Sequence, residues 1–392
     1  MRFLHTADWH LGRTIKQISR RLEFEAVLSE VVRIARDEAV DAVIIAGDTF
    51  DSAFASRDGY EERLLYETLG EIVRDGAQVV MIAGNHDSAT HMDAIAGILR
   101  MVGVHSIGTP PELAAQTVIR VSSRDKTEAA TIAALPWIPE RYALHFETLA
   151  EGIDPARLQY RAVLEGLIPR CFEAFAADTI NIFTGHLLID GSEIGEGGGE
   201  RKLHIGHNFA VEAACFPGTA SYVALGHIHK RQQIAAASPA YYSGSLIQLD
   251  FGEGGQRKYV NIVEAHAGAP ADIRSIEISG GRRLRTVTVP IDELSSQRGK
   301  YGDEYLRVIV QSDRPVASLL EQVRDVMSNA LEVNLERTDE PQPDRDQPAR
   351  QGLAPHELLG RYYHEKHDAQ IPEALVTLFN ELYESEAGHA PT

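Results

Sequence analysis

The sequence predicts an α/β fold with smaller units after a large N-terminal domain. Five short apolar runs, bounded by glycine and polar residues, lack helical spacing and are typical of buried strands. Helical patterns alternate with strand patterns as far as residue 279. The chain has 392 residues, 44% of them hydrophobic, which is enough for one large core and one or two smaller ones.

The elements of the N-terminal domain are predicted in order along the chain. The five buried strands fall at residues 3–4, 43–46, 79–82, 180–183 and 222–225. Residues 22–37 carry apolar side chains on one broad face, which predicts an amphipathic helix. Residues 259–263 predict one further strand.

Each of the five buried strands runs into residues that can bind a metal ion. The segments that follow the strands contain Asp8 and His10, then Asp48, then Asn85, then His186, and finally His227 and His229. In open α/β sheets the carboxyl ends of the strands line a crevice, so we expect these side chains to meet there.

The ligand types indicate a centre for two divalent ions. Asp, His and Asn without Cys suit Mn²⁺, Fe²⁺ or Mg²⁺ rather than a structural zinc site. Seven ligands exceed the need of one ion, whereas two ions about 3.5–4 Å apart that share a carboxylate would use them and would clamp a phosphate ester. We expect Asp48 to be the shared ligand, since Gly47 before it lets the backbone approach an ion closely.

The order of the motifs, D-x-H, G-D-x-x-D, G-N-H-D, G-H and G-H-x-H, resembles the calcineurin-like metallophosphoesterase superfamily. The amino-acid sequence of three of these motifs resembles that of the SbcD family of bacterial nuclease subunits; the motifs are residues 8–12, 47–51 and 226–229. The resemblance extends to about residue 250 and implies a two-sheet sandwich flanked by helices.

The resemblance also implies the role of each site residue. The first ion would be held by Asp8, His10 and His229, the second by Asn85, His186 and His227, with Asp48 shared. His86 would be the catalytic histidine, which donates a proton to the leaving 3′ oxygen or stabilises charge on the phosphate. The expected cofactors are two Mn²⁺ ions, with Mg²⁺ and Fe²⁺ as alternatives.

Several neighbouring residues have alternative roles. Asp87 could hydrogen-bond the ring of His86 or of a ligand histidine, and Asp51 could cap a following helix. Four basic residues after the first motif could contact a nucleic-acid backbone, or could equally form a solvated helix start: Arg13, Lys16, Arg20 and Arg21. The glycine-rich residues 195–199 predict a mobile loop near the metal site.

The predicted function is that of a metal-dependent DNA nuclease subunit. The resemblance implies 3′–5′ exonuclease and endonuclease cleavage at duplex ends and hairpins in DNA repair, recombination and replication. It also implies a homodimer within a heterotetramer with an SbcC-type ABC ATPase that has coiled-coil arms. The net charge of -19 argues against tight, unaided DNA binding, which fits a partner that shares the DNA.

Two other functions remain open from the sequence. A stand-alone nucleotide or cyclic-nucleotide phosphodiesterase would use the same ligands and would suit the acidic charge. A catalytically inactive scaffold for the ATPase is the second alternative, although such a protein would have no reason to keep all seven ligands and His86.

The domain organisation is predicted from changes in pattern. We expect a nuclease domain at residues 1–280, a small α+β capping domain at 281–337, a linker at 338–354 and a helical segment for partner docking at 355–387. Within the capping domain, strands are predicted at 286–289, 305–310 and 331–335 and a helix at 316–330. Residues 355–366 and 372–386 predict a hairpin of helices that either packs on its own domain or docks on a partner, and the family resemblance favours docking on the ATPase.

The sequence also predicts the compartment. The chain lacks both an apolar signal segment before Asp8 and a run of about 20 apolar residues that could span a membrane. Its two cysteines show neither a paired framework nor zinc spacing, which suits a reducing compartment. We therefore expect a cytoplasmic protein with no membrane contact.

Overall fold

The fold is taken from a computed structural model. It describes residues 1–53, 58–110, 118–139, 160–193, 210–338, 359–360, 363, 370–372 and 375–379. The chain forms two compact units, which are described separately. The first unit consists of Met1–Gln311 and Val316–Leu335, and the second consists of Ser312–Pro315 and Glu336–Thr392.

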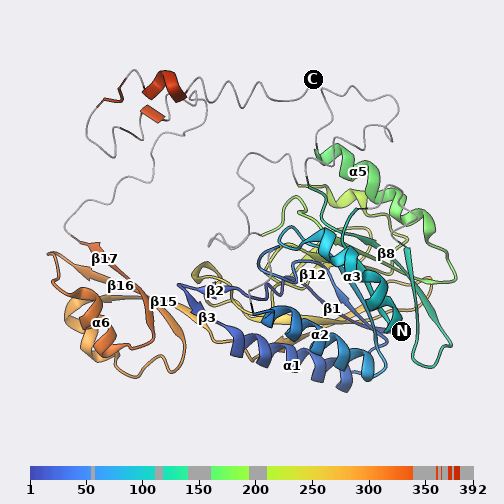
Figure 1. The fold of residues 1–392 in the computed structure, drawn as a ribbon, viewed down its shortest axis with the longest axis horizontal. Helices are drawn as coiled ribbons and strands as arrows, with labels where there is room; N and C mark the ends of the chain where they lie inside the picture. Colours follow the sequence, from blue (N-terminus) through green and yellow to red (C-terminus); the bar gives the residue numbers. More distant parts are fainter. Residues whose placement is uncertain are drawn as a thin grey trace. The chain divides into compact units, whose positions relative to one another are not determined.

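The first unit contains a six-stranded sheet with the order β14-β13-β1-β4-β5-β6. Strand β1 of this sheet is labelled in Figure 1. Its strands are β1 (Arg2–Thr6), β4 (Ala42–Ile45), β5 (Gln78–Ile82), β6 (Val104–Ile107), β13 (Lys258–Glu264) and β14 (Asp272–Ile278). Strands β1, β4, β5 and β6 are parallel, whereas β13 and β14 are antiparallel to their neighbours.

A second six-stranded sheet has the order β11-β12-β10-β9-β8-β7. Its strands are β7 (Val118–Ser122), β8 (Ala129–Leu135), β9 (Ile180–His186), β10 (Tyr222–Gly226), β11 (Gln232–Ile234) and β12 (Ala240–Tyr242). The four inner strands are parallel, and the two edge strands are antiparallel to them. All five predicted buried strands are confirmed, as β1, β4, β5, β9 and β10.

The two sheets pack face to face through a core of fully buried apolar side chains. This core joins Phe3, Ile44 and Val80 of the first sheet to Ile132 and Tyr222 of the second. The outer faces carry helices α1 (Arg21–Asp37), α2 (Tyr60–Arg74), α3 (Ala89–Met101) and α5 (Tyr160–Cys171). The two-sheet sandwich flanked by helices is therefore confirmed, and the helix predicted at 22–37 is α1.

Short elements complete the sandwich around its strand ends. They are the hairpin strands β2 (Thr14–Ile15) and β3 (Ile18–Ser19) and the 3₁₀ helices η4 (Phe172–Ala174), η5 (Ala213–Cys215) and η6 (Phe251–Glu253). The hairpin occupies the segment that contains Lys16, so the alternative prediction of a helix start is wrong there. Arg20 is the N-cap of α1 and Arg21 is its first residue, so a helix start is confirmed at these two positions.

A small α+β region with its own core follows the sandwich. It contains β15 (Leu284–Pro290), β16 (Tyr305–Ser312), β17 (Ala330–Arg337), η7 (Ile291–Gln297) and α6 (Leu319–Val326). The three predicted strands are present, but the helix is shorter than 316–330. Ser318 has a left-handed φ of 50°, and Met327 leaves the helical conformation at φ -128°, ψ 83°.

Few residues of the C-terminal segment belong to the described part of the chain. Residues 359–360, 363 and 375–379 are helical there. The rest of the predicted helices, the predicted linker beyond residue 338 and the glycine-rich residues 195–199 lie outside the described residues. Among the residues that are described, none belongs to a helix long and apolar enough to cross a membrane.

Candidate metal centre

The predicted ligands lie at the carboxyl ends of buried strands, either as the last residue of the strand, as His186 does in β9, or in the loop that follows. Four of them have a positive backbone φ: Asp8 at 52°, His10 at 49°, Asp48 at 51° and His227 at 105°. Non-glycine residues rarely adopt this conformation, and it persists where surrounding contacts enforce it, as at active sites. The fold therefore holds these side chains in position at a cost in backbone strain.

Two glycines allow the loops to pack this closely. A Cβ atom on Gly47 would lie 2.3 Å from Nδ1 of His186, and one on Gly84 would lie 2.1 Å from Oδ1 of Asp48. Both distances are far below van der Waals contact, so only glycine fits at these positions. The close neighbour of Gly47 is thus the side chain of His186, a different reason for glycine than the predicted approach of the backbone to an ion.

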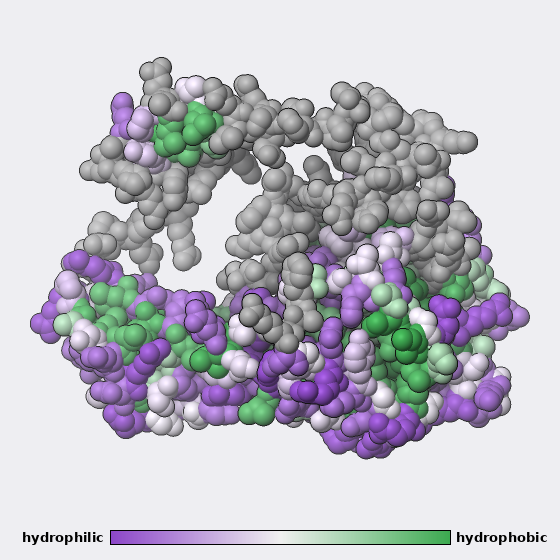
Figure 2. All heavy atoms as spheres, in the orientation of Figure 1, coloured by the Kyte–Doolittle hydropathy of each residue, from purple (hydrophilic) through white to green (hydrophobic). Residues whose placement is uncertain are grey.

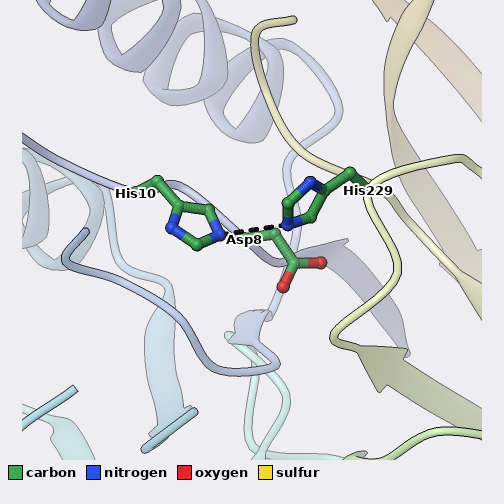
Figure 3. Close-up of side chains that lie close together, drawn as sticks. All are labelled: Asp8, His10 and His229. Carbon is green, nitrogen blue, oxygen red and sulfur yellow. Dashed lines mark hydrogen bonds between the residues drawn. The ribbon is translucent and has the colours of Figure 1, made fainter. Parts of the chain in front are cut away.

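The first ligand cluster is formed by Asp8, His10 and His229 (Figure 3). Nε2 of His10 lies 3.2 Å from Nε2 of His229. The other ring nitrogen of each histidine faces a carboxylate: Nδ1 of His229 lies 2.9 Å from Glu253, and Nδ1 of His10 lies 3.3 Å from Asp51. If each Nδ1 carries the hydrogen, two Nε2 lone pairs face each other, an arrangement that fits a shared cation.

The second ligand cluster is centred on Asn85. Its Oδ1 lies 3.1 Å from Nε2 of His186 and 3.0 Å from Nδ1 of His227. Nδ1 of His186 faces the carbonyl oxygen of Ala46 at 2.9 Å, which leaves Nε2 for a ligand bond. Trp137 stacks on the ring of His227, with centroids 5.3 Å apart and planes at 22°.

Asp48 lies between the two clusters. Its Oδ2 is 3.7 Å from Nε2 of His10 and 3.4 Å from Nε2 of His186. Its Oδ1 accepts a hydrogen bond of 2.8 Å from the backbone N–H of His86. One carboxylate oxygen therefore reaches ligands of both clusters, which is the position a bridging ligand needs.

The electrostatics of the centre fit bound cations. Asp8 and Asp48 are almost fully buried, and buried carboxylates need paired positive charge. Burial raises the pKa of Asp8. Burial alone would lower the pKa of His186, but the carboxylate of Asp48 raises it to about 9. Burial lowers the pKa of His227 to about 3, so this imidazole stays neutral and keeps a lone pair for a metal.

The structure corrects two predictions about neighbouring carboxylates. Asp87 does not contact a histidine ring; it accepts backbone N–H bonds from Thr49, Phe50 and Gly84 at 2.8–3.2 Å and so ties two ligand loops together. Burial and the charge of Asp48 raise the pKa of Asp87 to about 6.

Asp51 caps no helix among the residues that the structure describes. Helix α2 begins at Tyr60, with Gly59 at its N-cap. The side chain of Asp51 lies beside His10, and its carbonyl oxygen lies 2.8 Å from Nδ1 of His86. The prediction missed this role because the sequence does not show that residues 48–51 run alongside the first motif, where Leu11 and Phe50 form a parallel bridge.

His86 lies beside the first cluster. Its ring centroid is 4.7 Å from that of His10, with the planes at 82°. It also lies near enough to His10 and Asp48 to share an ion with them. The geometry is thus compatible with a ligand role as well as with the predicted catalytic role, and the latter stays a prediction.

The four basic residues after the first motif have different environments. Arg20 is buried, forms a two-point ion pair with Glu23 and donates to the carbonyl oxygen of Gln248, so a nucleic-acid role for it is wrong. The other three lie nearer the surface: Lys16 pairs with Glu332 at 2.8 Å, Arg21 pairs with Asp58 at 2.6 Å, and Arg13 lies 3.4 Å from Asp51.

Sequence reasoning missed Glu253 and Trp137, which contact ligand histidines. Glu253 contacts His229, and Trp137 stacks on His227. Neither belongs to a motif, and nothing in the local sequence of Glu253 marks its carboxylate as buried. Only the fold brings η6 and the end of β8 to the ligand loops.

Two protein families match parts of this chain. Residues 1–231 match the calcineurin-like phosphoesterase family, and residues 281–367 match a family described as the type 5 capsule protein repressor C-terminal domain.

Three related proteins are each named as the SbcD subunit of the nuclease SbcCD. That of Bacillus subtilis is 34% identical over 288 residues, 72% of this chain and 71% of the relative. That of Rhodobacter capsulatus is 31% identical over 370 residues, 89% of each chain, and that of Escherichia coli K12 is 29% identical over 315 residues, 77% of this chain and 74% of the relative. The chain therefore belongs to the calcineurin-like phosphoesterase family and, within it, to the SbcD nuclease subunits.

Proposed function

We propose that this chain is a two-metal DNA nuclease that cleaves phosphodiester bonds at duplex ends and hairpins as an exonuclease and endonuclease. The observation that carries the proposal is the position of Asp48, one oxygen of which lies within 3.7 Å of a ligand nitrogen in each cluster. Two ions bound there would supply Lewis-acid activation and would offset charge on the attacking and leaving oxygens of the ester.

The residues around the centre would orient the reacting groups. Asp51 accepts through its carbonyl oxygen from Nδ1 of His86 and so fixes the ring. A protonated His86 would then offer Nε2–H to the leaving 3′ oxygen, in the role of a general acid. Asp87 holds the loops of Asp48 and Asn85 together through backbone N–H groups, which keeps the ligands of the two ions in register.

The ligand set favours Mn²⁺ as the cofactor. Four imidazoles, two carboxylates and one amide mix nitrogen with oxygen donors, whereas Mg²⁺ prefers oxygen ligands and retains water. Fe²⁺ would accept the same donors. Metal content of the purified chain, measured by mass spectrometry after each ion is supplied in turn, distinguishes these cofactors.

Arg13 is our candidate for binding the substrate phosphate. It lies at the edge of the first cluster, with its guanidinium 3.4 Å from Asp51, and about 29% of its side chain is exposed. Its Nε atom is buried and, among the described residues, lacks a hydrogen-bond partner. A guanidinium with a spare donor suits a phosphate oxygen.

The partner would be an SbcC-type ABC ATPase, since the relatives are named as subunits of SbcCD. We propose a nuclease domain at 1–280, a capping domain at 281–337, a linker at 338–354 and an ATPase-docking segment at 355–387. Leu375 and Leu378 are 39% and 51% exposed in the helical residues 375–379, which supports docking on an apolar partner surface. Removal of residues 355–392 should abolish co-purification with the ATPase while Mn²⁺-dependent hydrolysis remains; retained co-purification would contradict the docking proposal.

A second copy of this chain is the proposed partner of helix α3. Only Met92 of this helix is buried, whereas Ile98 and Met101 are 71% and 86% exposed and Val102, just after it, is 55% exposed. Figure 2 shows a hydrophobic patch in the region of α3. Large exposed apolar patches mark interaction sites, and a homodimer within a heterotetramer would cover this one.

The proposed nuclease activity is tested with end-labelled duplex DNA and Mn²⁺. Wild-type chain should release nucleotides stepwise, and EDTA should stop the release. A chromogenic phosphodiester is the matched small substrate. Hydrolysis of this diester without cleavage of DNA would instead support a stand-alone nucleotide phosphodiesterase, which the net charge of -19 would suit.

A further inference from the structure

Glu253 forms a buried contact with a ligand histidine of the first cluster. Its Oε1 accepts a hydrogen bond from Nδ1 of His229 at 2.9 Å, and the two side chains are 4% and 3% exposed. Glu253 ends the short helix η6, and Asp250 before that helix accepts from the N–H of Gly252 at 2.7 Å. The carboxylate therefore approaches the metal centre from an ordered turn.

The other oxygen of Glu253 is also fully engaged. Oε2 accepts from Nζ of Lys258 at 2.6 Å and from the backbone N–H of Leu249 at 3.1 Å. Nζ of Lys258 donates as well to the carbonyl oxygen of His229 at 3.0 Å and to the hydroxyl of Ser245 at 2.9 Å. Lys258 thus connects the backbone of His229 to the carboxylate that contacts its ring.

Stability alone does not account for this arrangement. Moving two charges out of water costs several kcal/mol per ion, so a buried ion pair is weak evidence for a stabilising role. A carboxylate that accepts from Nδ1 of a metal-binding histidine fixes the tautomer and raises the basicity of Nε2. Nε2 of His229 is the atom that faces Nε2 of His10 at 3.2 Å.

In the second cluster, His186 also has a hydrogen-bond partner at Nδ1, but that partner is not charged. Nδ1 of His186 faces the neutral carbonyl oxygen of Ala46, not a carboxylate. Both histidines of the first cluster, in contrast, have a carboxylate beside Nδ1: Glu253 for His229 and Asp51 for His10. The two metal sites therefore differ in the charge of the group that lies beside Nδ1 of these histidines.

We propose that Glu253 is a positioning residue of the first metal site, which holds His229 with its hydrogen on Nδ1 and Nε2 directed at the ion, while Lys258 keeps the carboxylate in place. The proposal rests on the two-metal centre of the proposed function. In this proposal, His229 is a more basic ligand than an imidazole whose Nδ1–H donates to a carbonyl oxygen. Loss of Glu253 should therefore weaken the binding of the ion at the first site and leave the binding of the other ion unchanged.

The test is a Mn²⁺ titration of the full chain by calorimetry, with Glu253→Gln compared with wild type. The variant should bind one of two Mn²⁺ ions about 10–100-fold more weakly, because loss of an outer-shell partner has this effect on metal affinity. The other ion should bind within about twofold of wild type. In the electron paramagnetic resonance spectrum, the signal of a coupled ion pair should give way to the six lines of isolated Mn²⁺ at limiting metal.

Two further variants separate positioning from folding. Glu23→Gln is the matched control, because Glu23 is also buried and paired, with Arg20 at 2.6 Å, but does not contact a proposed ligand. It should leave both Mn²⁺ affinities unchanged. The double variant Glu253→Gln/Lys258→Met removes both buried charges, so it avoids an unpaired lysine and should show the same selective loss as Glu253→Gln.

Three results would overturn the proposal. If Glu253→Gln and the double variant both bind two Mn²⁺ ions as tightly as wild type does, the positioning role of Glu253 is refuted. The two-metal centre itself would not be affected by that result. Equal weakening of both sites, shared by Glu23→Gln, would show a general effect on folding. A wild-type chain that binds no Mn²⁺ would overturn the metal centre itself and the positioning role with it.

Discussion

Nε2 of His10 and Nε2 of His229 lie 3.2 Å apart, although 219 residues separate them in the chain. The first follows β1, and the second follows β10 of the other sheet. The contact therefore forms only when both sheets are assembled. Metal binding at this pair would favour the folded state over the unfolded one, because the unfolded chain has no preformed site.

We expect Asp48→Asn to abolish Mn²⁺-dependent cleavage and to reduce the bound metal below two ions per chain. The substitution removes the negative charge that lies between the clusters, whereas the size of the side chain stays the same. Metal content and the rate of DNA cleavage measure the effect, with the surface variant Asp125→Asn as the control. Unchanged stoichiometry and rate in Asp48→Asn would refute the bridging role.

We expect His86→Gln to keep both ions and to slow turnover by about 10²- to 10⁴-fold, the usual contribution of a general acid. The ring of His86 is near enough to His10 and Asp48 to ligate, so the metal measurement decides between the two roles. Loss of one Mn²⁺ would make His86 a ligand. Retention of both ions with a normal rate would remove it from the reaction.

We expect Arg13→Gln to raise KM for DNA by about 10–100-fold with little change in kcat, since a hydrogen bond to a charged group contributes about 1.5–3 kcal/mol. Arg21→Gln is the matched control, because Arg21 is a nearby arginine that pairs with Asp58. Initial rates over a range of DNA concentrations give both constants. An equal rise of KM in the control would point to nonspecific attraction of DNA.

Most of the fold could be predicted from the sequence, together with the clustering of the predicted ligands at the strand ends, because a buried strand has a local signature. The runs before Asp48 and Asn85 are entirely apolar and lead directly into the ligand loops. The short hairpin β2–β3 was missed because each strand has only two residues, too few for a pattern. Helix α6 was predicted too long because its end depends on backbone angles at Met327.

The residues that contact the predicted ligand histidines could not be predicted from the sequence. Glu253 and Asp51 approach the histidines from loops whose course depends on the packing of both sheets. Arg20 was a candidate for contact with nucleic acid, but it is buried and pairs with Glu23, an uncommon position for an arginine. A single sequence specifies which residues can bind a metal, but not the tertiary partner that each one meets.

We expect Ile98→Glu to convert a dimer of this chain into monomers, because it places a charge in the exposed apolar face of α3. The measurement is molar mass by light scattering after size-exclusion chromatography. Leu22→Glu is the control, since Leu22 is 80% exposed on another helix, α1. A wild-type chain that elutes as a monomer at micromolar concentration, or a dimer that survives Ile98→Glu, would contradict the α3 interface.

We expect the buried His5 to make stability depend on pH. Its ring lies between the hydroxyl of Tyr222 at 2.8 Å and the carbonyl oxygen of Leu225 at 3.2 Å, and burial lowers its pKa from 6.5 to about 3. Between these values only the unfolded chain binds the proton at this position. The contribution of neutral His5 is therefore complete above pH 6.5 and declines as pH falls toward 3.

From pH 7 to pH 5 this one group should reduce the free energy of unfolding by about 2 kcal/mol, given about 1.4 kcal/mol per pH unit below the unfolded pKa. Urea unfolding of wild type and His5→Gln at both pH values measures it as a double difference, so that contributions from other groups cancel. The exposed His266→Gln should show the wild-type pH dependence. If His5→Gln loses as much stability as wild type between pH 7 and pH 5, then His5 also takes up a proton in the folded chain.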